Sequence, residues 1–224
     1  EVVRSNDVLT LAHSLRAEQR LLPYPIVIAA ILGVLYGLEH IHGLADDQGR
    51  PLGVVHRDLS LRNLMLGYDG IPKIIDFGVA RAELDDFRTR PGVVPGTLRF
   101  VSPELARGEA VDHRSDLYAV GLVLYELLCG APVVPPGGDP LSTIRSVIEG
   151  APTPLHLANP DIPQTLSAVV MKALAKDREA RWQSAAELKE AITRAAPTWA
   201  AIESSLIGTF LRIWFKEDAQ RADA

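Results

Sequence analysis

The sequence has little of what disulfide-stapled or membrane-spanning proteins need. Its single cysteine, Cys129, has no partner for an internal disulfide and lies in an apolar, helical run, so we expect a buried thiol in a reducing cytoplasm. The apolar runs from Ile26 to Leu38 and from Leu117 to Cys129 each contain about 13 residues, whereas a membrane span requires about 20. We therefore expect two buried helices and no membrane span in this segment.

The start of the chain also lacks familiar features. Glu1 stands first without an initiator methionine, and no positively charged stretch followed by an apolar one opens the sequence, as a signal peptide would require. We expect a cytoplasmic protein whose sequence is cut at its start.

A basic surface for nucleic acid is missing as well. The formal net charge is −5, the pI is near 5.7, and the Lys and Arg residues are scattered along the chain. Nucleic acid is therefore excluded as an expected partner. What is present is a chain of 224 residues, 47% hydrophobic and 23% charged, which is the balance of a globular domain with a substantial core.

Helical patterns dominate the sequence. An amphipathic segment from Asn6 to Glu18 has Asp7 as a candidate N-cap. The apolar run after Pro25 predicts a central helix, and Ser115 with Asp116 begins a second buried helix that ends at Gly130. The last two thirds of the chain are mostly helical by pattern. The fold class is therefore mainly α, and α+β overall.

Three motifs follow one another in a fixed order. His56-Arg57-Asp58 is accompanied by Asn63, five residues after Asp58. Asp76-Phe77-Gly78 and Ser102-Pro103-Glu104 come later, with Asp76 18 residues beyond Asp58. One tripeptide alone is a weak signal, but this joint occurrence is not. The motifs resemble the catalytic loop, the metal-binding DFG motif and a variant of the APE motif of protein kinases.

The chain therefore resembles the C-terminal lobe of a bacterial eukaryotic-like (Hanks-type) serine/threonine protein kinase. The resemblance implies a kinase-like helical lobe with short β hairpins at the catalytic loop, and the cofactors ATP and Mg²⁺. It implies that Asp58 orients or accepts the proton of a substrate hydroxyl, while Asn63 and Asp76 bind the metal that bridges the phosphates. The alternative is that the three residues only cap turns and satisfy loop backbone.

The catalytic loop departs from the family pattern at one position. Most serine/threonine kinases carry a lysine two residues after the catalytic aspartate, and this chain has Ser60 there. Arg62 occupies the position at which many tyrosine kinases carry an arginine that reaches the same phosphate, and arginine can pair with phosphate oxygens. A solvated loop charge is the other interpretation of Arg62.

Specificity for serine and threonine hydroxyls rests on the segment G-T-L-R-F-V-S-P-E, from Gly96 to Glu104. It resembles the peptide-docking segment of serine/threonine kinases, in which the threonine, here Thr97, bonds to the catalytic aspartate. Arg57 implies a kinase whose activation loop is phosphorylated or acidic, and Thr89 is the candidate for phosphorylation. An unmodified surface threonine is the alternative.

The resemblance also implies two structural pairings and a nucleotide site. Asp116 would bind the backbone of the catalytic loop, and Arg181 would pair with Glu104. The cofactor-binding group has low specificity: Glu1 and Val3 would lie in the hinge that binds adenine, Asp7 would meet the ribose, and Met65 would floor the ring. Val3, Asp7 and Met65 could each instead be a core or capping residue.

Domain boundaries follow from the extent of the resemblance. We assign residues 1–193 to a partial kinase domain, hinge and C-lobe, and residues 194–224 to an amphipathic helical extension. In the extension, Ile202, Leu206, Phe210 and Trp214 lie at helical spacing, widened by Ile207 and Leu211. A packing helix is favoured there over a partner-docking one.

No glycine-rich loop and no strand lysine for the phosphates occur in the sequence. The expected partner is therefore a missing N-lobe, in the same or an adjoining chain, besides ATP and a protein substrate with Ser or Thr hydroxyls. Alone, the chain should be inactive. The rival hypothesis is a pseudokinase-like lobe that serves as a protein-binding scaffold.

Overall fold

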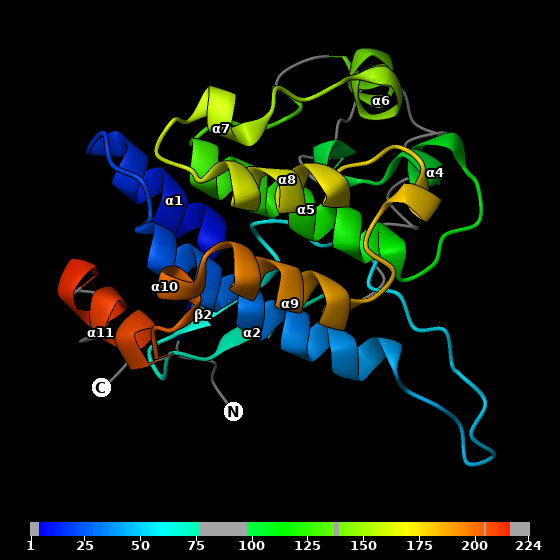
Figure 1. Cartoon of the computed structure of the whole chain (residues 1–224), viewed down its shortest axis with the longest axis horizontal. Coiled ribbons are helices and arrows are strands. Elements are labelled where there is room, and N and C mark those ends of the chain that lie inside the picture. Colours follow the sequence, from blue (N-terminus) through cyan, green and yellow to red (C-terminus); the bar gives the residue numbers. More distant parts are fainter. Residues whose placement is uncertain (1–4, 77–97, 137–138, 204, 216–224) are drawn as a thin grey trace.

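The computed structural model describes residues 5–76, 98–136, 139–203 and 205–215. Within these residues the regular structure is helical apart from one small antiparallel sheet with strand order β1-β2-β3 (Figure 1), and residues 44–63 form a long loop with one isolated bridge between Ala45 and Pro51. The expectation of a mainly α fold with a short hairpin beside the catalytic loop is confirmed. In chain order the first elements are β1 (Ser5–Asp7), α1 (Val8–Ala17), α2 (Tyr24–His42), β2 (Leu64–Gly67) and β3 (Pro72–Ile74).

The remaining elements of the described chain are helices joined by loops. The elements are η1 (Leu98–Phe100), α4 (Pro103–Arg107), α5 (Arg114–Cys129), α6 (Pro140–Glu149), α7 (Leu155–Ala158), α8 (Gln164–Ala173), η2 (Arg178–Ala180), α9 (Ala185–Ala195), α10 (Pro197–Ala200) and α11 (Ser205–Trp214).

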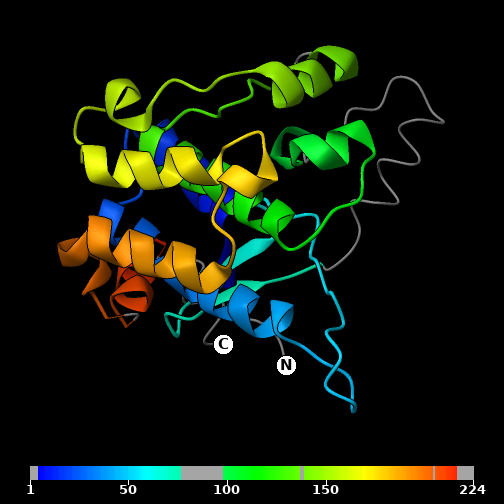
Figure 2. The ribbon, with the colours of Figure 1, turned by 45° about the vertical axis from the view of Figure 1, so that its right-hand side comes forward.

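Helix α5 is the centre of the molecule. Every residue from Ser115 to Leu128 is buried, and α2, α7, α8 and η1 pack around the helix (Figure 2). Gly130 ends it in a left-handed conformation with φ of 76°, which a residue without Cβ adopts at little cost. The prediction of a second buried helix with these ends is confirmed.

Helix α2 is longer than the apolar run that predicted it. It contains 19 residues, and by length and composition it is the one helix in the described chain that could cross a membrane. The expectation of a segment too short for a span was therefore wrong, because the helix continues past the run to His42. Half of its most apolar window is buried, and α5, α9, α10 and β3 contact it. Packing inside the lobe accounts for its apolar character.

The segment before α1 forms a strand that the sequence did not predict. In the pairing of β1 with β2, Ser5 lies opposite Gly67 and Asp7 lies opposite Met65. Pairing of β2 with β3 then places Met65 opposite Lys73. Three residues are too few for a pattern of period two to emerge from the sequence.

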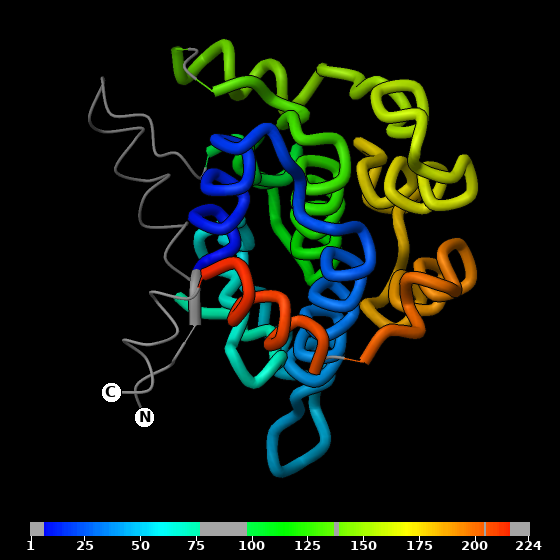
Figure 3. The backbone as a smooth tube through the Cα atoms, turned by 90° about the vertical axis from the view of Figure 1, so that its left-hand side faces the viewer, coloured from blue at the N-terminus to red at the C-terminus, as the bar shows by residue number. Residues whose placement is uncertain are grey.

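The C-terminal part packs onto the preceding elements as expected, with Ile207 and Leu211 of the predicted apolar stripe buried. Two helices form, α10 and α11, and α11 packs on α2 and β2 (Figure 3). Its buried residues are Ile207, Gly208 and Leu211, whereas Leu206 is exposed. A Cβ on Gly208 would collide with the backbone of Tyr68, so the close approach of α11 to the β2–β3 turn selects this face.

Candidate active site

The catalytic loop, residues 56–63, is held in place by a buried carboxylate. Asp116 Oδ2 accepts a hydrogen bond from the His56 N–H at 2.9 Å, and Oδ1 accepts one from the Arg57 N–H at 2.9 Å. His42 Nε2 lies 2.8 Å from the same Oδ2. Arg57 has a φ of 69°, a conformation that non-glycine residues rarely adopt without support. The predicted role of Asp116 is confirmed, and these bonds explain how the turn at Arg57 is maintained.

His56 connects the loop to the end of β3. Its Nε2 lies 3.0 Å from the Ile75 carbonyl oxygen, which can only accept, and the Asp58 N–H lies 3.3 Å from Nδ1. A neutral ring protonated at Nε2 satisfies both contacts. Burial lowers the pKa of His56, partly opposed by Asp116. His56 is therefore a neutral, structural side chain that orients the backbone of Asp58.

The two polar side chains at the centre of the loop are brought together. Asn63 Nδ2 donates to the backbone oxygen of Asp58 at 2.8 Å and to its Oδ2 at 2.9 Å. Both residues are buried. The amide thus fixes one carboxylate oxygen of Asp58 and leaves its own Oδ1 outside these two bonds. A carboxylate held in one orientation can accept the proton of a substrate hydroxyl. An amide oxygen beside it can serve as a ligand of a metal ion.

Asp76 follows β3 and is exposed, with a φ of 59°. The Ile75 N–H donates to the Asn63 carbonyl oxygen at 3.0 Å, so the chain brings Asp76 next to the loop that carries Asn63. Together these residues offer one carboxylate and one amide oxygen. That set fits Mg²⁺, which takes one or two protein carboxylates and completes its shell with phosphate oxygens and water. Within the described residues no group of three or more metal-ligating His, Cys, Asp or Glu side chains occurs.

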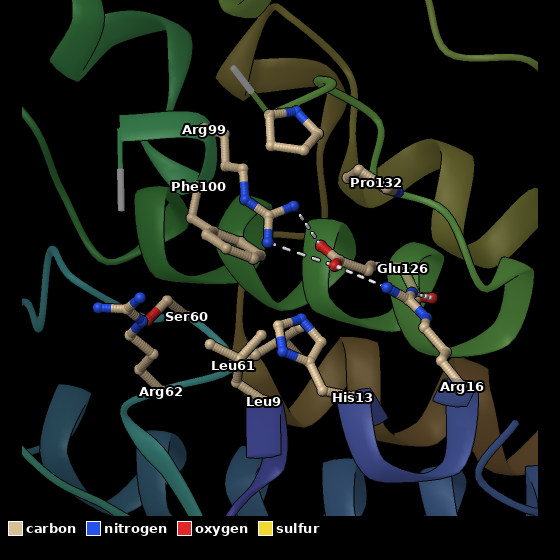
Figure 4. A pocket seen from close by; sticks show the side chains of 11 residues that line it. Leu9, His13, Arg16, Ser60, Leu61, Arg62, Arg99, Phe100, Glu126 and Pro132 are labelled. Carbon is tan, nitrogen blue, oxygen red and sulfur yellow. Dashed lines mark hydrogen bonds and ion pairs between the residues drawn. The ribbon is translucent and has the colours of Figure 1, made fainter. Parts of the chain in front are cut away.

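Ser60 and Arg62 differ in environment. Ser60 is 1% exposed, and its Oγ has no hydrogen-bond partner among the described residues. Arg62 is exposed, and no hydrogen bond or ion pair joins it to another described residue. Both line a pocket of about 280 Å³ beside the catalytic loop (Figure 4).

The pocket contains a buried ion pair that sequence reasoning missed. Glu126, on α5, is 2% exposed. Arg99 Nη1 lies 2.7 Å from Glu126 Oε2, and Arg99 Nη2 lies 3.3 Å from Oε1. A second cation, Arg16 of α1, approaches Oε1 at 3.8 Å. The signal that could have revealed this pair is a glutamate within the apolar body of a buried helix. An unpaired buried charge is costly, so a glutamate at such a position indicates a partner of opposite charge.

A second buried pair anchors the segment after η1. Arg181 Nη1 and Nη2 bind Glu104 Oε1 and Oε2 at 2.8 and 2.7 Å, and Ser115 Oγ donates to Oε1 at 2.6 Å. Burial by itself would raise the pKa of Glu104, but these hydrogen bonds outweigh it and lower the pKa to about 2. The pairing predicted from the sequence is confirmed.

The predicted nucleotide-binding residues are described only in part. Asp7 and Met65 lie opposite each other across β1 and β2. Both carboxylate oxygens of Asp7 are taken by Thr10, whose N–H and hydroxyl lie at 2.8 and 2.7 Å, so the capping role is confirmed and the ribose contact stays a prediction. Four residues lie outside the described part of the chain: Glu1, Val3, Thr89 and Thr97.

The fold and the catalytic loop define a protein kinase lobe, and sequence comparison agrees. The family model described as the protein kinase domain matches residues 1–192, and the chain belongs to this family.

Several bacterial kinases are similar to the chain. The tyrosine-protein kinase MasK of Myxococcus xanthus is 33% identical over 219 residues, 97% of this chain and 34% of that protein. The probable serine/threonine-protein kinase PknB of Bifidobacterium longum is 43% identical over 164 residues, 71% of this chain and 22% of that protein. The chain thus spans about a third or less of the length of these curated relatives.

Among solved structures, the kinase domain of Mycobacterium tuberculosis PknI is similar with a TM-score of 0.63 and 26% identity. The match covers 88% of this chain and 64% of that domain.

Proposed function

We propose that this chain is the substrate-binding and catalytic-loop half of a kinase that transfers the γ-phosphate of ATP to serine or threonine hydroxyls of proteins. The observation that carries the proposal is the fixed carboxylate of Asp58, oriented by Asn63 on a loop that Asp116 holds. Phosphoryl transfer needs little covalent help and depends on such positioning. Its dependence on ATP places the proposed reaction in the cytoplasm.

Each polar side chain has a role in this proposal. Asp58 accepts a hydrogen bond from the substrate hydroxyl and takes up its proton as the new oxygen–phosphorus bond forms, while the bond from the γ-phosphorus to the β,γ-bridging oxygen breaks and ADP leaves. Asn63 Oδ1 and the Asp76 carboxylate would hold Mg²⁺. When bound, the metal neutralises charge on the phosphate oxygens.

Preference for serine and threonine is part of the proposal. It is supported by the segment that contains Thr97 and by the names of relatives such as PknB. MasK is named a tyrosine kinase, so the acceptor residue has to be measured.

We further propose that the elements that grip the phosphates of ATP are supplied from outside these 224 residues. The sequence contains no G-x-G-x-x-G loop, and the structural match covers 64% of the PknI kinase domain. The proposal is supported if the chain alone transfers no phosphate while the natural protein that contains it does.

A scaffold without catalysis is the second candidate, and one observation favours it. Ser60 replaces the lysine of most serine/threonine kinases, and its side chain is buried without a described partner. In that case the loop would retain its geometry without the cation that holds the transferred phosphate.

The deciding experiment is Mg²⁺-dependent transfer of ³²P from ATP to a generic protein by the full natural protein, with phosphoamino-acid analysis. Asp58→Asn should lower the rate at least 100-fold, the scale of a positioned general base. Asp47→Asn, an exposed aspartate on the loop after α2, is the matched control and should retain activity. Equal rates for Asp58→Asn and wild type would overturn the catalytic role of Asp58, and no transfer by the folded protein would support the scaffold. Labelled tyrosine would overturn the serine/threonine assignment.

A further inference from the structure

The pocket beside the catalytic loop lies where α1, η1 and α5 meet (Figure 4). The Leu9 N–H donates to the Leu61 carbonyl oxygen at 3.0 Å, which ties the first turn of α1 to the loop. Through this contact the pocket is fixed relative to Asp58, three residues before Leu61. When the hydroxyl of a protein substrate reaches Asp58, we therefore expect substrate residues a few positions away from that hydroxyl to lie beside the pocket.

Glu126 is the one acidic side chain among the described residues that line the pocket, and it is not available to a ligand. Glu126 is 2% exposed and already bound by Arg99 on both carboxylate oxygens, with Arg16 approaching one of them. A basic substrate side chain would have to displace an arginine from a buried carboxylate, which is costly. The pocket is therefore unsuited to lysine or arginine.

The described residues that line the pocket carry more positive than negative charge. Among the described residues, three arginines and one glutamate line the pocket, together with His13. With His13 neutral, these residues carry a formal charge of plus two in a chain whose net charge is −5. Arg62 is exposed and unpaired among the described residues. Arg99 uses two of its five N–H donors on Glu126. Both arginines thus have donors with no described acceptor, and both line a pocket whose apolar lining includes Leu9 and Pro132 (Figure 4).

We propose that this pocket binds an acidic side chain of the protein substrate, within a few residues of the hydroxyl that is phosphorylated. The carboxylate pairs with Arg62 and the free donors of Arg99, and its aliphatic stem lies on the apolar wall. The inference rests on the proposed kinase function for its biological meaning. It assigns Arg62 to the substrate, not to the phosphate of ATP.

Peptide kinetics with the full natural protein test the assignment. One serine peptide is varied so that Glu, Gln or Lys stands at each position flanking the acceptor. At one position or more, Glu should exceed Gln by about tenfold in kcat/KM, as expected for a charge-assisted hydrogen bond, and Lys should be the poorest. Equal rates for Glu and Gln at every position, with Asp58-dependent transfer intact, would overturn the pocket and leave the kinase function standing.

Arg62→Gln separates the two roles of this arginine. If Arg62 binds the substrate acid, the variant loses the preference for Glu over Gln while rates with the Gln peptide change little. If Arg62 holds the phosphate, rates with all peptides fall together and the preference survives, which would contradict the inference. Arg212→Gln, which removes an exposed arginine on α11, should preserve both rate and preference. Arg99 is the poorer target, because its loss leaves Glu126 buried without its main partner.

A binding measurement tests the pocket without catalysis. Fluorescence anisotropy compares labelled Glu and Gln peptides on the 224-residue chain and on its Arg62→Gln variant. Binding of the Glu peptide should be about tenfold tighter to the unmodified chain, and equal to that of the Gln peptide on the variant. If no peptide is phosphorylated, the kinase proposal fails, and this measurement alone decides the pocket. Equal binding of both peptides to the unmodified chain would overturn it.

Discussion

Glu104 and Glu126 are both buried carboxylates held by an arginine with two short contacts, yet the arginines differ in what surrounds them. The side chain of Arg181, the partner of Glu104, is 0% exposed, whereas the side chain of Arg99, the partner of Glu126, is 16% exposed. The first pair is closed off from solvent. The second lies at the wall of a pocket.

The donors of the two arginines show the same difference. Besides Glu104, Arg181 donates to the backbone oxygens of Ala175, Arg114 and Lys176 at 2.8, 3.3 and 3.1 Å, so each of its five N–H groups has an acceptor. Arg99 binds Glu126 alone among the described residues and rests over the Phe100 ring at 4.5 Å. An arginine whose N–H donors all have acceptors within the protein can only stabilise the fold. An arginine that keeps free donors at a pocket can also bind a ligand.

The largest expected effect is from Arg181→Ala. It leaves Glu104 buried without a counter-charge, which costs about 3–5 kcal/mol of unfolding free energy. Urea denaturation of wild type and variant measures the loss. Arg178→Ala is the control, since the Arg178 side chain is 39% exposed, donates to the Ala110 carbonyl oxygen and joins surface ion pairs with Asp112 and Glu179, the pairs being worth about 1 kcal/mol or less. A loss at Arg181 no larger than at Arg178 would break the comparison.

The second-largest expected effect is the loss in acid of the closed pair, Glu104 with Arg181. The pKa of Glu104 is about 2 in the folded protein, below its ordinary value of 4.5. The unfolded chain therefore takes up this proton first, and stability is fully present above pH 4.5 and is lost as pH falls toward 2. The contribution is on the order of 3 kcal/mol. Denaturant unfolding from pH 5 to pH 2 should show the decline.

Glu104→Gln isolates the effect, because other carboxylates titrate in the same range. Burial would raise the pKa of Asp112, but hydrogen bonds from Arg114 outweigh it and hold the pKa at about 2. The difference in unfolding free energy between wild type and Glu104→Gln should therefore shrink as pH falls. A difference independent of pH would mean that Glu104 is not charged in the folded protein.

Arg99→Ala should cost less than Arg181→Ala. Arg16 remains near Glu126, and water can enter from the pocket to solvate the carboxylate. We expect a loss of about 1–3 kcal/mol, the range for hydrogen bonds to a charged group. The same urea series measures it. Loss equal to that of Arg181→Ala would show that the pocket offers Glu126 no solvation, and the distinction between the closed and the open pair would fail.

The sequence could predict the closed pair and not the open one for a physical reason. Arg181 and Glu104 stand in motifs whose spacing resembles kinases, as do Asp116 and the catalytic loop, and the structure confirms these contacts. Arg99 and Glu126 meet only because η1 packs on α5, a contact between segments 27 residues apart. Periodicity reports which residues face the core, but not which loop a buried charge will meet.

The same limit applies to the ends of elements. Helices with caps, such as α1 at Asp7 and α5 at Gly130, were predicted close to their observed bounds. The three-residue strand β1 and the exposure of Leu206 on α11 depend on their neighbours across the fold. Contacts of that kind leave no local pattern, and they were missed.

The smallest expected effect is from Arg16→Ala, which removes the outer cation of the open pair. Arg16 lies 3.8 Å from Glu126 Oε1, and its side chain is 29% exposed, so solvent screens the attraction. We expect a loss of about 0.5 kcal/mol from Arg16→Ala in wild type. In the Arg99→Ala background Arg16 becomes the sole counter-charge of Glu126 among the described residues, and its removal should cost at least 1 kcal/mol more than in wild type. Urea denaturation of the two single variants and the double variant measures this coupling. Additive losses would show that the two arginines do not share Glu126, and that the carboxylate is stabilised by Arg99 alone.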